Sequence, residues 1–522
     1  MGSKRRSVDE YQRTTGRRRP PQAPRAPEVP GRAAPLEIDP GEFRAVGHRL
    51  VDAIAGHLAT LRDLPITRGE GPEEIRRALG GNGIPEEGTE PRALLESITP
   101  LLLAHSLFNG HPKFLGYITS SATPIGALAD FLAAAINPNV GAWQLSPVAT
   151  EIELQTIRWI AQLIGYPDRC GGVLVSGGNM ANFIGVLAAR RRQVTWDVRT
   201  EGLSARGPLV MYASKETHTW IQKAADLFGF GTGAIRWITT DDHYRMDLRR
   251  LAAEIDRDRN EGRQPFLVVG TAGSVSLGAV DPLPEIAELC RREGLWFHVD
   301  GAYGAIGAAL PGASAELKGL AEADSVAVDP HKWLYAPLEA GCALVRRPED
   351  MIAAFSFHPE YYTFQGEEQT NLFEFGLQNS RGFRALKIWL GLRQAGRKGI
   401  VRLVEDDIAM AQALFDEVGR QELLEPFGCR LSIATFRFVP EDLRSGDAST
   451  DEYLNRLNQE VLARLQRGGE VFLSNAVAED RFLLRACVVN FRTTKRDMEE
   501  IAAIVVRIGK EVDAELRPGR KG

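Results

Sequence analysis

The chain of 522 residues has few cysteines, and none of the five falls into a C-x-x-C pair. This pattern indicates neither a zinc site nor a disulfide framework, so we expect no metal, and unpaired thiols favour a reducing cytoplasm. No apolar run reaches the roughly 20 residues that a membrane helix needs. The first residues also lack the apolar core of a secretory signal. We therefore expect a cytoplasmic protein without a membrane partner.

A strong charge of one sign is missing as well. The formal net charge of −5 gives no general attraction to nucleic acid. The 44% hydrophobic and 25% charged residues are ordinary for a globular protein, and the length suits more than one domain. Residues 1–36 differ, because they are rich in arginine and proline with few large apolar side chains. We interpret them as a disordered tail, with nucleic-acid binding as the less favoured alternative.

The ordered chain is predicted to begin with a helix. Asp39 suits the N-cap and Pro40 the first turn, and apolar residues from Phe43 to Leu58 then recur at helical spacing. Residues 37–120 therefore form a helical segment whose apolar stripe packs either on its own domain or on a second subunit.

The most informative stretch runs from Ser325 to Val345. It predicts a buried strand, a loop with His331, Lys332 and Trp333, and a returning strand. A lone loop lysine is usually a surface residue whose stem packs and whose amine is solvated. An amine between two buried strands is instead suited to a Schiff base with the aldehyde of pyridoxal phosphate, PLP.

A carboxylate accompanies this lysine. The strand that begins at Trp296 ends on Asp300, and the carboxyl ends of parallel strands are where open α/β sheets bind ligands. Asp329 competes with Asp300 as the partner of a cofactor, but it lies three residues from Lys332 on the same loop. The pyridine nitrogen lies across the ring from the aldehyde, so we favour Asp300.

Four motifs occur in the order typical of one enzyme family: His-Pro-Lys-Phe at 111–114, Ser-Gly-Gly-Asn-x-Ala-Asn at 176–182, His-Val-Asp-x-Ala-Tyr at 298–303 and Pro-His-Lys-Trp at 330–333. From about Phe43 onward the chain resembles the PLP-dependent group II decarboxylases, the group of aromatic-L-amino-acid decarboxylase. The resemblance implies an α/β type I PLP fold with a mostly parallel sheet. Residues 121–400 would form the large PLP-binding domain and residues 401–522 a small α+β domain. It also implies a homodimer formed through the N-terminal helices.

The resemblance assigns a cofactor site. Lys332 would form the Schiff base, Asp300 would hold the ring nitrogen, and His218 would stack on the ring and serve in catalysis. Gly177, Gly178 and Asn179 would bind the phosphate, because glycine lets the backbone approach an oxyanion at a helix start. The full set of predicted cofactor contacts is Gly177, Gly178, Asn179, His218, Ser274, Asp300, Ala302, His331 and Lys332.

The resemblance also places the substrate pocket in two segments, and the predicted pocket residues are Phe114, Tyr117, Ile118, Ser120 and Trp143. Aromatic rings suit an aromatic substrate. Taken without the resemblance, such residues are more often plain core.

The predicted reaction is decarboxylation of an L-amino acid, most simply an aromatic one, to the amine and carbon dioxide. Residues 352–380 lack periodicity and are interpreted as a lid. At the place of the family's lid tyrosine stand Leu372 or Phe373, and this change favours the alternative of an aldehyde-forming oxidase, unless Tyr361 or Tyr362 supplies the hydroxyl. A non-catalytic PLP-binding regulator is the alternative from another class. For Arg485 and Arg492 we favour a structural role.

Overall fold

A computed structural model describes residues 34–81, 83–203, 207–357, 369–444 and 448–517. The chain divides into two compact units, one made of the residues up to Leu58 with Leu79–Ala104 and the other of Ala59–Ala78 with the residues from His105 onward. The predicted tail therefore lies almost wholly outside the described residues, as do Tyr361 and Tyr362.

The first unit is built on helices α2 (Pro40–Thr60) and α4 (Pro91–His105). The carboxylate of Asp39 accepts hydrogen bonds from the backbone N–H groups of Gly41 and Glu42, at 2.8 and 3.3 Å, which confirms the predicted N-cap. The apolar stripe of α2 stays largely exposed: Val46 is its buried residue, while Val51 and Ile54 are more than 40% exposed.

The second unit contains a large sheet. Within the described ranges it has seven strands in the order β1-β7-β6-β5-β4-β2-β3, and only β7 runs antiparallel to its neighbours. The predicted mostly parallel α/β sheet is therefore confirmed. The strands are β1 (Gly171–Val175), β2 (Leu209–Ser214), β3 (Ile235–Ile238), β4 (Gln264–Thr271), β5 (Trp296–Asp300), β6 (Ser325–Val328) and β7 (Gly341–Val345).

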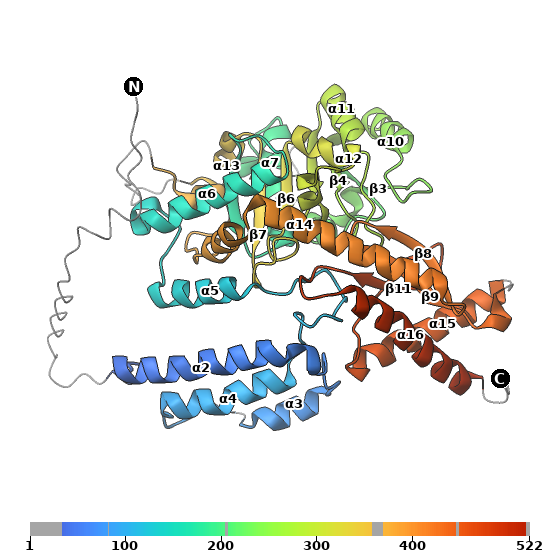
Figure 1. The fold of residues 1–522 in the computed structure, drawn as a ribbon. Coiled ribbons are helices and arrows are strands. Elements are labelled where there is room, and N and C mark those ends of the chain that lie inside the picture. Colours follow the sequence, from blue (N-terminus) through green and yellow to red (C-terminus); the bar gives the residue numbers. More distant parts are fainter. Residues whose placement is uncertain (1–33, 82, 204–206, 358–368, 445–447, 518–522) are drawn as a thin grey trace, which may run out of the picture. The chain divides into compact units, whose positions relative to one another are not determined.

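Helices cover both faces of this sheet, as a parallel sheet of buried strands requires. One core joins alternate strand residues to α7, α9 and α13, and the other joins the remaining residues to α6, α10, α11 and α14 (Figure 1). The helices on the two faces are α6 (Pro147–Leu163), α7 (Gly178–Gln193), α9 (Trp220–Leu227), α10 (Leu248–Asn260), α11 (Leu283–Glu293), α13 (Pro348–Phe355) and α14 (Ala385–Arg420). Further helices are α3 (Pro72–Leu79), α5 (Pro124–Ile136), α8 (Val198–Glu201) and α12 (Ala315–Lys318).

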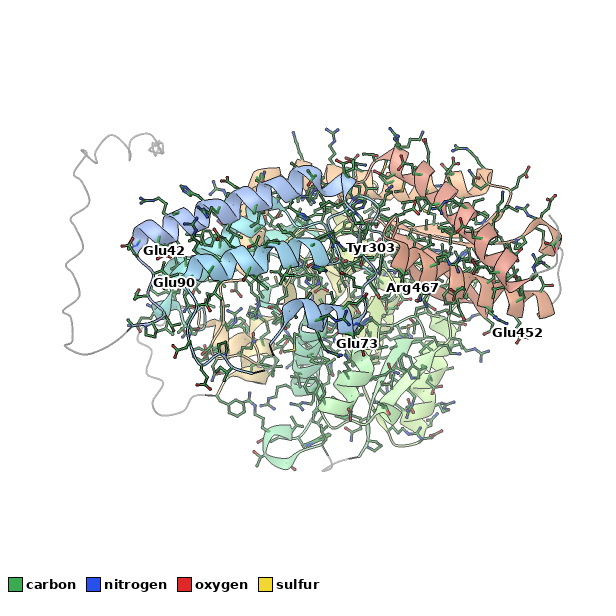
Figure 2. All side chains as sticks on the ribbon, turned by 90° about the horizontal axis from the view of Figure 1, so that it is seen from below. Glu42, Glu73, Glu90, Tyr303, Glu452 and Arg467 are labelled. Carbon is green, nitrogen blue, oxygen red and sulfur yellow. The ribbon has the colours of Figure 1, made fainter. Side chains whose placement is uncertain are left out.

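The C-terminal part forms a smaller antiparallel sheet in the order β10-β11-β9-β8, packed on two helices and on the second half of α14. In Figure 2, Glu452 and Arg467 lie near opposite ends of its helix α15. This arrangement agrees with the predicted small α+β domain. Its elements are β8 (Leu424–Arg430), β9 (Ile433–Phe438), α15 (Ala448–Gly468), β10 (Ser474–Ala478), β11 (Arg481–Cys487) and α16 (Lys495–Leu516).

Helix α14 belongs to both cores. Ile388 and Leu392 pack in the large core, and Leu414 and Val418 pack in the small one. A break at Gly396, with φ of 65° and ψ of 171°, lies between them. The two helical halves meet at this break, which lies close to the expected domain boundary near residue 400.

Short 3₁₀ turns complete the fold: Leu61–Asp63, Trp143–Leu145, Thr232–Ala234, Gly304–Ala309, Gly319–Glu322, Leu372–Phe375 and Glu441–Leu443. None of the helices in the described part of the chain combines the length and apolar character needed to cross a bilayer.

Candidate active site

A cavity of about 580 Å³ opens at the carboxyl edge of the large sheet. It brings together ten residues that the sequence singled out from distant segments, which are Tyr117, Ile118, Gly177, Gly178, Asn179, His218, Asp300, Ala302, His331 and Lys332. The strands β1, β2, β5 and β6 all end at this cavity, so the parallel arrangement explains why these segments meet.

Lys332 lies on the loop between β6 and β7. Its backbone N–H donates to the carbonyl of Asp329 at 2.9 Å, and its carbonyl accepts from the N–H of Tyr335 at 3.1 Å. His331 holds the other side of the loop, where its Nδ1 accepts from the N–H of Ala340 at 3.1 Å. The loop is therefore a set of tight turns, and the lysine stem enters the cavity from a fixed backbone.

Asp329 is the immediate partner of the lysine amine. Its Oδ2 lies 3.1 Å from Nζ of Lys332 and 3.6 Å from Nε2 of His331. Its Oδ1 is buried and has no hydrogen-bond partner among the described residues. Asp329 thus neutralises the ammonium of Lys332 when the lysine carries no other group.

Asp300 ends β5 and is 8% exposed. Its Oδ2 accepts a hydrogen bond from Nε1 of Trp220 at 2.7 Å, and its Oδ1 accepts from the N–H of Ala302 at 3.2 Å. These two donors hold the carboxylate in one orientation at the cavity. Trp220 was not predicted, because only the folded chain brings the start of α9 to the end of β5.

His298 lies beneath this carboxylate but does not hydrogen bond to it. Its Nδ1 and Nε2 are each 2.7 Å from a partner, the hydroxyl of Ser325 and the amide oxygen of Asn182. Burial lowers the pKa of His298 to about 4. The ring is therefore neutral near pH 7, and it packs edge-on to Trp220 with centroids 5.7 Å apart.

The start of α7 forms the floor of the cavity. Gly177 has φ of 138°, a conformation that side chains disfavour. A Cβ added to Gly178 would lie 2.8 Å from Oδ2 of Asp329, so the backbone is open only because no side chain stands there. The first N–H groups of a helix have no partner inside it, and together with the helix dipole they favour a phosphate.

His218 precedes α9 and lines the same cavity. Its Nδ1 accepts from the N–H of Trp220 at 3.3 Å, which fixes the ring orientation. Burial lowers the pKa of His218, while the nearby Asp300 carboxylate raises it and the Lys332 ammonium lowers it. These influences show that the imidazole lies within electrostatic reach of both groups.

Two predicted pocket residues line the cavity. Tyr117 is 56% exposed with φ of 54°, and its ring lies 6.1 Å from the ring of Phe472. Ile118 is buried beside it. The cavity thus has an apolar wall formed by the loop that follows the His-Pro-Lys-Phe motif.

The other predicted contacts lie outside the cavity wall. Phe114 stacks on Phe472 at 5.1 Å, and the hydroxyl of Ser120 donates to the carbonyl of His331 at 2.8 Å. Nε1 of Trp143 donates to Glu151 at 2.9 Å, and the hydroxyl of Ser274 accepts from the N–H of Ala279 at 3.2 Å. In the single chain these four side chains support the fold around the site, and their contact with ligand stays a prediction.

Arg485 lines the cavity although the sequence favoured a structural role. It is 2% exposed on β11, where its Nη1 donates to the hydroxyl of Ser474 and its Nη2 to the carbonyl of Tyr117 at 3.1 Å. Burial lowers the pKa of its guanidinium, and Nε has no partner among the residues described. An arginine in the buried part of β11, among Leu483, Leu484 and Ala486, was the signal that could have marked it.

Glu216 also lines the cavity and was not predicted. Burial raises the pKa of this carboxyl group. Leu372, by contrast, is fully buried in a small cluster with Val140 and Ala149 and does not line the cavity. Phe373 donates its backbone N–H to the carbonyl of Gly141 at 3.0 Å.

These groups fit PLP. An amine on a fixed loop can bind the aldehyde, an open helix start can bind the phosphate, and a buried carboxylate can pair with the ring nitrogen. The glycine floor leaves room that a Cβ at position 178 would remove. A mostly parallel sheet with this site at its carboxyl edge defines a PLP-dependent enzyme.

The chain belongs to the pyridoxal-dependent decarboxylase family, whose conserved domain matches residues 72–428. It is 33% identical over 483 residues to an aromatic-L-amino-acid decarboxylase of Bacillus atrophaeus, covering 91% of this chain and 97% of that protein. It is 27% identical to a phenylacetaldehyde synthase of Arabidopsis thaliana, with 90% and 96% covered.

Among solved structures it resembles Oryza sativa TDC with PLP and tryptamine, with a TM-score of 0.85, 26% identity, and 92% of this chain and 99% of that chain covered. The predicted group II family, the PLP cofactor and the class of carboxy-lyase are therefore confirmed. The reaction is PLP-dependent decarboxylation of an amino acid.

Proposed function

We propose that this enzyme decarboxylates an aromatic L-amino acid and releases the amine and carbon dioxide. The observation that carries the proposal is the apolar wall of Tyr117 and Ile118, which shares one cavity with Lys332 and Asp300. Tyr117 is backed by Phe472, so a flat ring can pack there. The similarity to an aromatic-L-amino-acid decarboxylase supports the same substrate class.

PLP, when bound, supplies a carbonyl for the substrate amine and a ring that withdraws electrons from the bond to the carboxylate. Lys332 would hold the cofactor through Nζ, and Asp300 would accept a hydrogen bond from the ring nitrogen. His218 and Ala302 would line the ring, and the N–H groups at Gly177, Gly178 and Asn179 would bind the phosphate.

Arg485 contributes the positive charge that draws the substrate carboxylate to this wall of the cavity. Its guanidinium is held by Ser474 and Tyr117, and its Nε lacks a partner within the described part of the chain. A buried guanidinium held in one orientation is well suited to a carboxylate.

An aldehyde-forming oxidase is the second candidate. It is favoured by Leu372 and Phe373, since either would stand at the place of the family's lid tyrosine and neither has a hydroxyl, and by the similarity to a phenylacetaldehyde synthase. A panel of aromatic, acidic and diamino acids distinguishes the two when carbon dioxide, amine, aldehyde and peroxide are assayed together. Amine without peroxide supports the decarboxylase, and aldehyde with equimolar peroxide and ammonia supports the oxidase.

Lys332→Ala tests the proposed site directly. The variant should lose turnover and the visible absorption of lysine-linked PLP, because no other amine replaces Nζ. Lys398→Ala is the matched control, since Lys398 is exposed on α14. Full turnover by Lys332→Ala would refute the assignment. If the wild-type protein bound PLP but turned over none of the amino acids, the non-catalytic regulator would be favoured.

We also propose that the enzyme is a homodimer. Helix α5 exposes Leu128 by 54%, Leu132 by 50% and Ile136 by 63%, an apolar stripe that a second subunit would cover. Sedimentation of the wild type should give twice the chain mass. Leu132→Glu should shift the equilibrium toward monomer, and a wild-type monomer at micromolar concentration would exclude the dimer.

A further inference from the structure

Asp407 is a buried carboxylate in α14 that receives three hydrogen bonds. It is 2% exposed. Its Oδ2 accepts from Nε1 of Trp333 at 2.9 Å and from the hydroxyl of Tyr335 at 2.6 Å, and its Oδ1 accepts from the N–H of Asn490 at 3.2 Å. Burial raises the pKa of Asp407 to about 7, and the three donors oppose that rise. The donors come from two segments more than 70 positions away in the chain.

Two of these donors lie on the loop of Lys332, within three residues after it. Trp333 follows Lys332 directly, and the N–H of Tyr335 donates to the carbonyl of Lys332 at 3.1 Å. Tyr335 has φ of 53°, a conformation that a bulky residue adopts only when its surroundings hold it there. The hydrogen bond from its hydroxyl to Asp407 is such a restraint, and it is fully buried.

Trp333 connects the same carboxylate to the cavity wall. Its ring packs on Tyr303 with centroids 4.7 Å apart, and Tyr303, labelled in Figure 2, lines the cavity. The hydroxyl of Tyr303 lies 2.7 Å from the hydroxyl of Ser432, at the edge of the small sheet. Displacing the indole would therefore move both the lysine loop and this wall.

The third donor, the N–H of Asn490, connects the C-terminal domain to Asp407. Asn490 follows β11, the strand that carries Arg485, and its Nδ2 donates to the carbonyl of His111 at 2.8 Å. Asp407 thus holds the lysine loop and the segment after β11 through its two oxygens. A shift of either segment must alter the hydrogen bonds of the other.

We propose that Asp407 is a positioning residue for Lys332, which acts through Trp333 and Tyr335 without touching cofactor or substrate. The proposal rests on the role of Lys332 in the proposed function. Its consequence is that the place of the lysine amine depends on the small domain, because Asn490 shares the same carboxylate.

The carboxamide of asparagine cannot accept all the hydrogen bonds that the carboxylate of Asp407 accepts. In Asp407→Asn the amide NH₂ must face either the N–H of Asn490 or the pair of donors from Trp333 and Tyr335, so donors oppose each other in both orientations. Asp406→Asn is the matched control, because Asp406 is the exposed neighbour on α14, with 64% of its side chain accessible.

The test compares the rate of PLP association, followed by absorbance, and kcat at saturating PLP. Asp407→Asn should slow both by roughly tenfold or more, which corresponds to the loss of one buried hydrogen bond, and Asp406→Asn should match the wild type. Tyr335→Phe removes a single donor and should shift both values in the same direction by a smaller factor, so it carries the test if Asp407→Asn does not fold.

A double-mutant cycle separates positioning from general support. In Lys332→Ala supplied with a small primary amine as substitute, Asp407→Asn should cost no further activity, because the residue it positions is gone. An equal loss in both backgrounds, or a PLP association rate equal to that of Asp406→Asn, would overturn the proposal. Full activity of Lys332→Ala without added amine would instead refute the proposed function itself.

Discussion

Replacing Asp300 by asparagine removes the negative charge next to the ring nitrogen and leaves the shape of the side chain nearly unchanged. The amide oxygen can still accept from Nε1 of Trp220, which now donates to Oδ2 at 2.7 Å. Asp300 is 8% exposed, so water can replace the lost charge only in small part. The perturbation therefore removes the charge together with the weaker of the two accepted hydrogen bonds, because the amide NH₂ then faces the N–H of Ala302, which donates to Oδ1 at 3.2 Å.

The magnitude follows from the hydrogen bond that is weakened. A bond to a charged partner contributes about 1.5–3 kcal/mol, which corresponds to a rise in the Kd of PLP of about 10- to 150-fold. The loss in kcat should be larger, on the order of 100- to 1,000-fold, because the charge also stabilises the electron-rich transition state.

Fluorescence titration of the coenzyme-free protein measures the Kd, and carbon dioxide release at saturating PLP measures kcat. Asp226→Asn on α9 is the control, since this exposed carboxylate lies on the helix that Trp220 begins. A wild-type Kd together with a wild-type kcat in Asp300→Asn would refute the reasoning and direct attention to Asp329.

Three other changes are expected to act on separate parts of the site. Arg485→Met keeps the bulk of the buried side chain and removes its charge, so KM for the amino acid should rise at least tenfold in steady-state assays, while an unchanged KM would exclude contact with the carboxylate. Gly178→Ala places a Cβ 2.8 Å from Oδ2 of Asp329, and the affinity for PLP measured by titration should fall by roughly tenfold; an unaltered Kd would show that the phosphate binds elsewhere. His298 has a pKa lowered from 6.5 to about 4, so the folded chain binds fewer protons than the unfolded chain between these values, and stability falls as the pH drops through this window. Between pH 7 and pH 5, urea unfolding should show a change in stability that is about 2 kcal/mol less favourable in the wild type than in His298→Gln, because the other titrating groups are common to both.

The strands and many of the residues that line the cavity could be predicted because their signals are local. Each strand that matters is a short apolar run followed by its functional group, as in the strand that ends on Asp300. Parallel packing then brings the ends of these strands to one edge of the sheet. The meeting of Gly178, His218 and Lys332 in one cavity therefore follows from the strand order, without knowledge of any individual side-chain contact.

The contacts that could not be predicted are pairs of side chains from distant segments. Nothing near Asp407 in sequence indicates that it accepts from Trp333 and Tyr335, and nothing near Trp220 indicates its bond to Asp300. The run from residue 385 to 420 gave no reason to expect two helical halves that meet at Gly396 and contribute to two separate cores.

Pocket residues were harder to assign for a related reason. Aromatic side chains pack equally well in a core and in a binding site, so Phe114 and Tyr117 share one local pattern. Only the folded chain separates them, with Phe114 3% exposed against Phe472 and Tyr117 56% exposed at the cavity.

The antiparallel strand β7 sits between β1 and β6, and its residue Gly341 packs so closely on Gly177 that a Cβ there would lie 2.6 Å from the backbone. The phosphate-binding turn and the lysine loop therefore become neighbours only after a late-synthesised segment inserts beside an early one. Uptake of vitamin B6 should therefore require that β7 is already in place. Once bound, the coenzyme opposes unfolding by about 2.7 kcal/mol when its free concentration reaches 100 times its Kd, so coenzyme supply should set how long the folded enzyme survives.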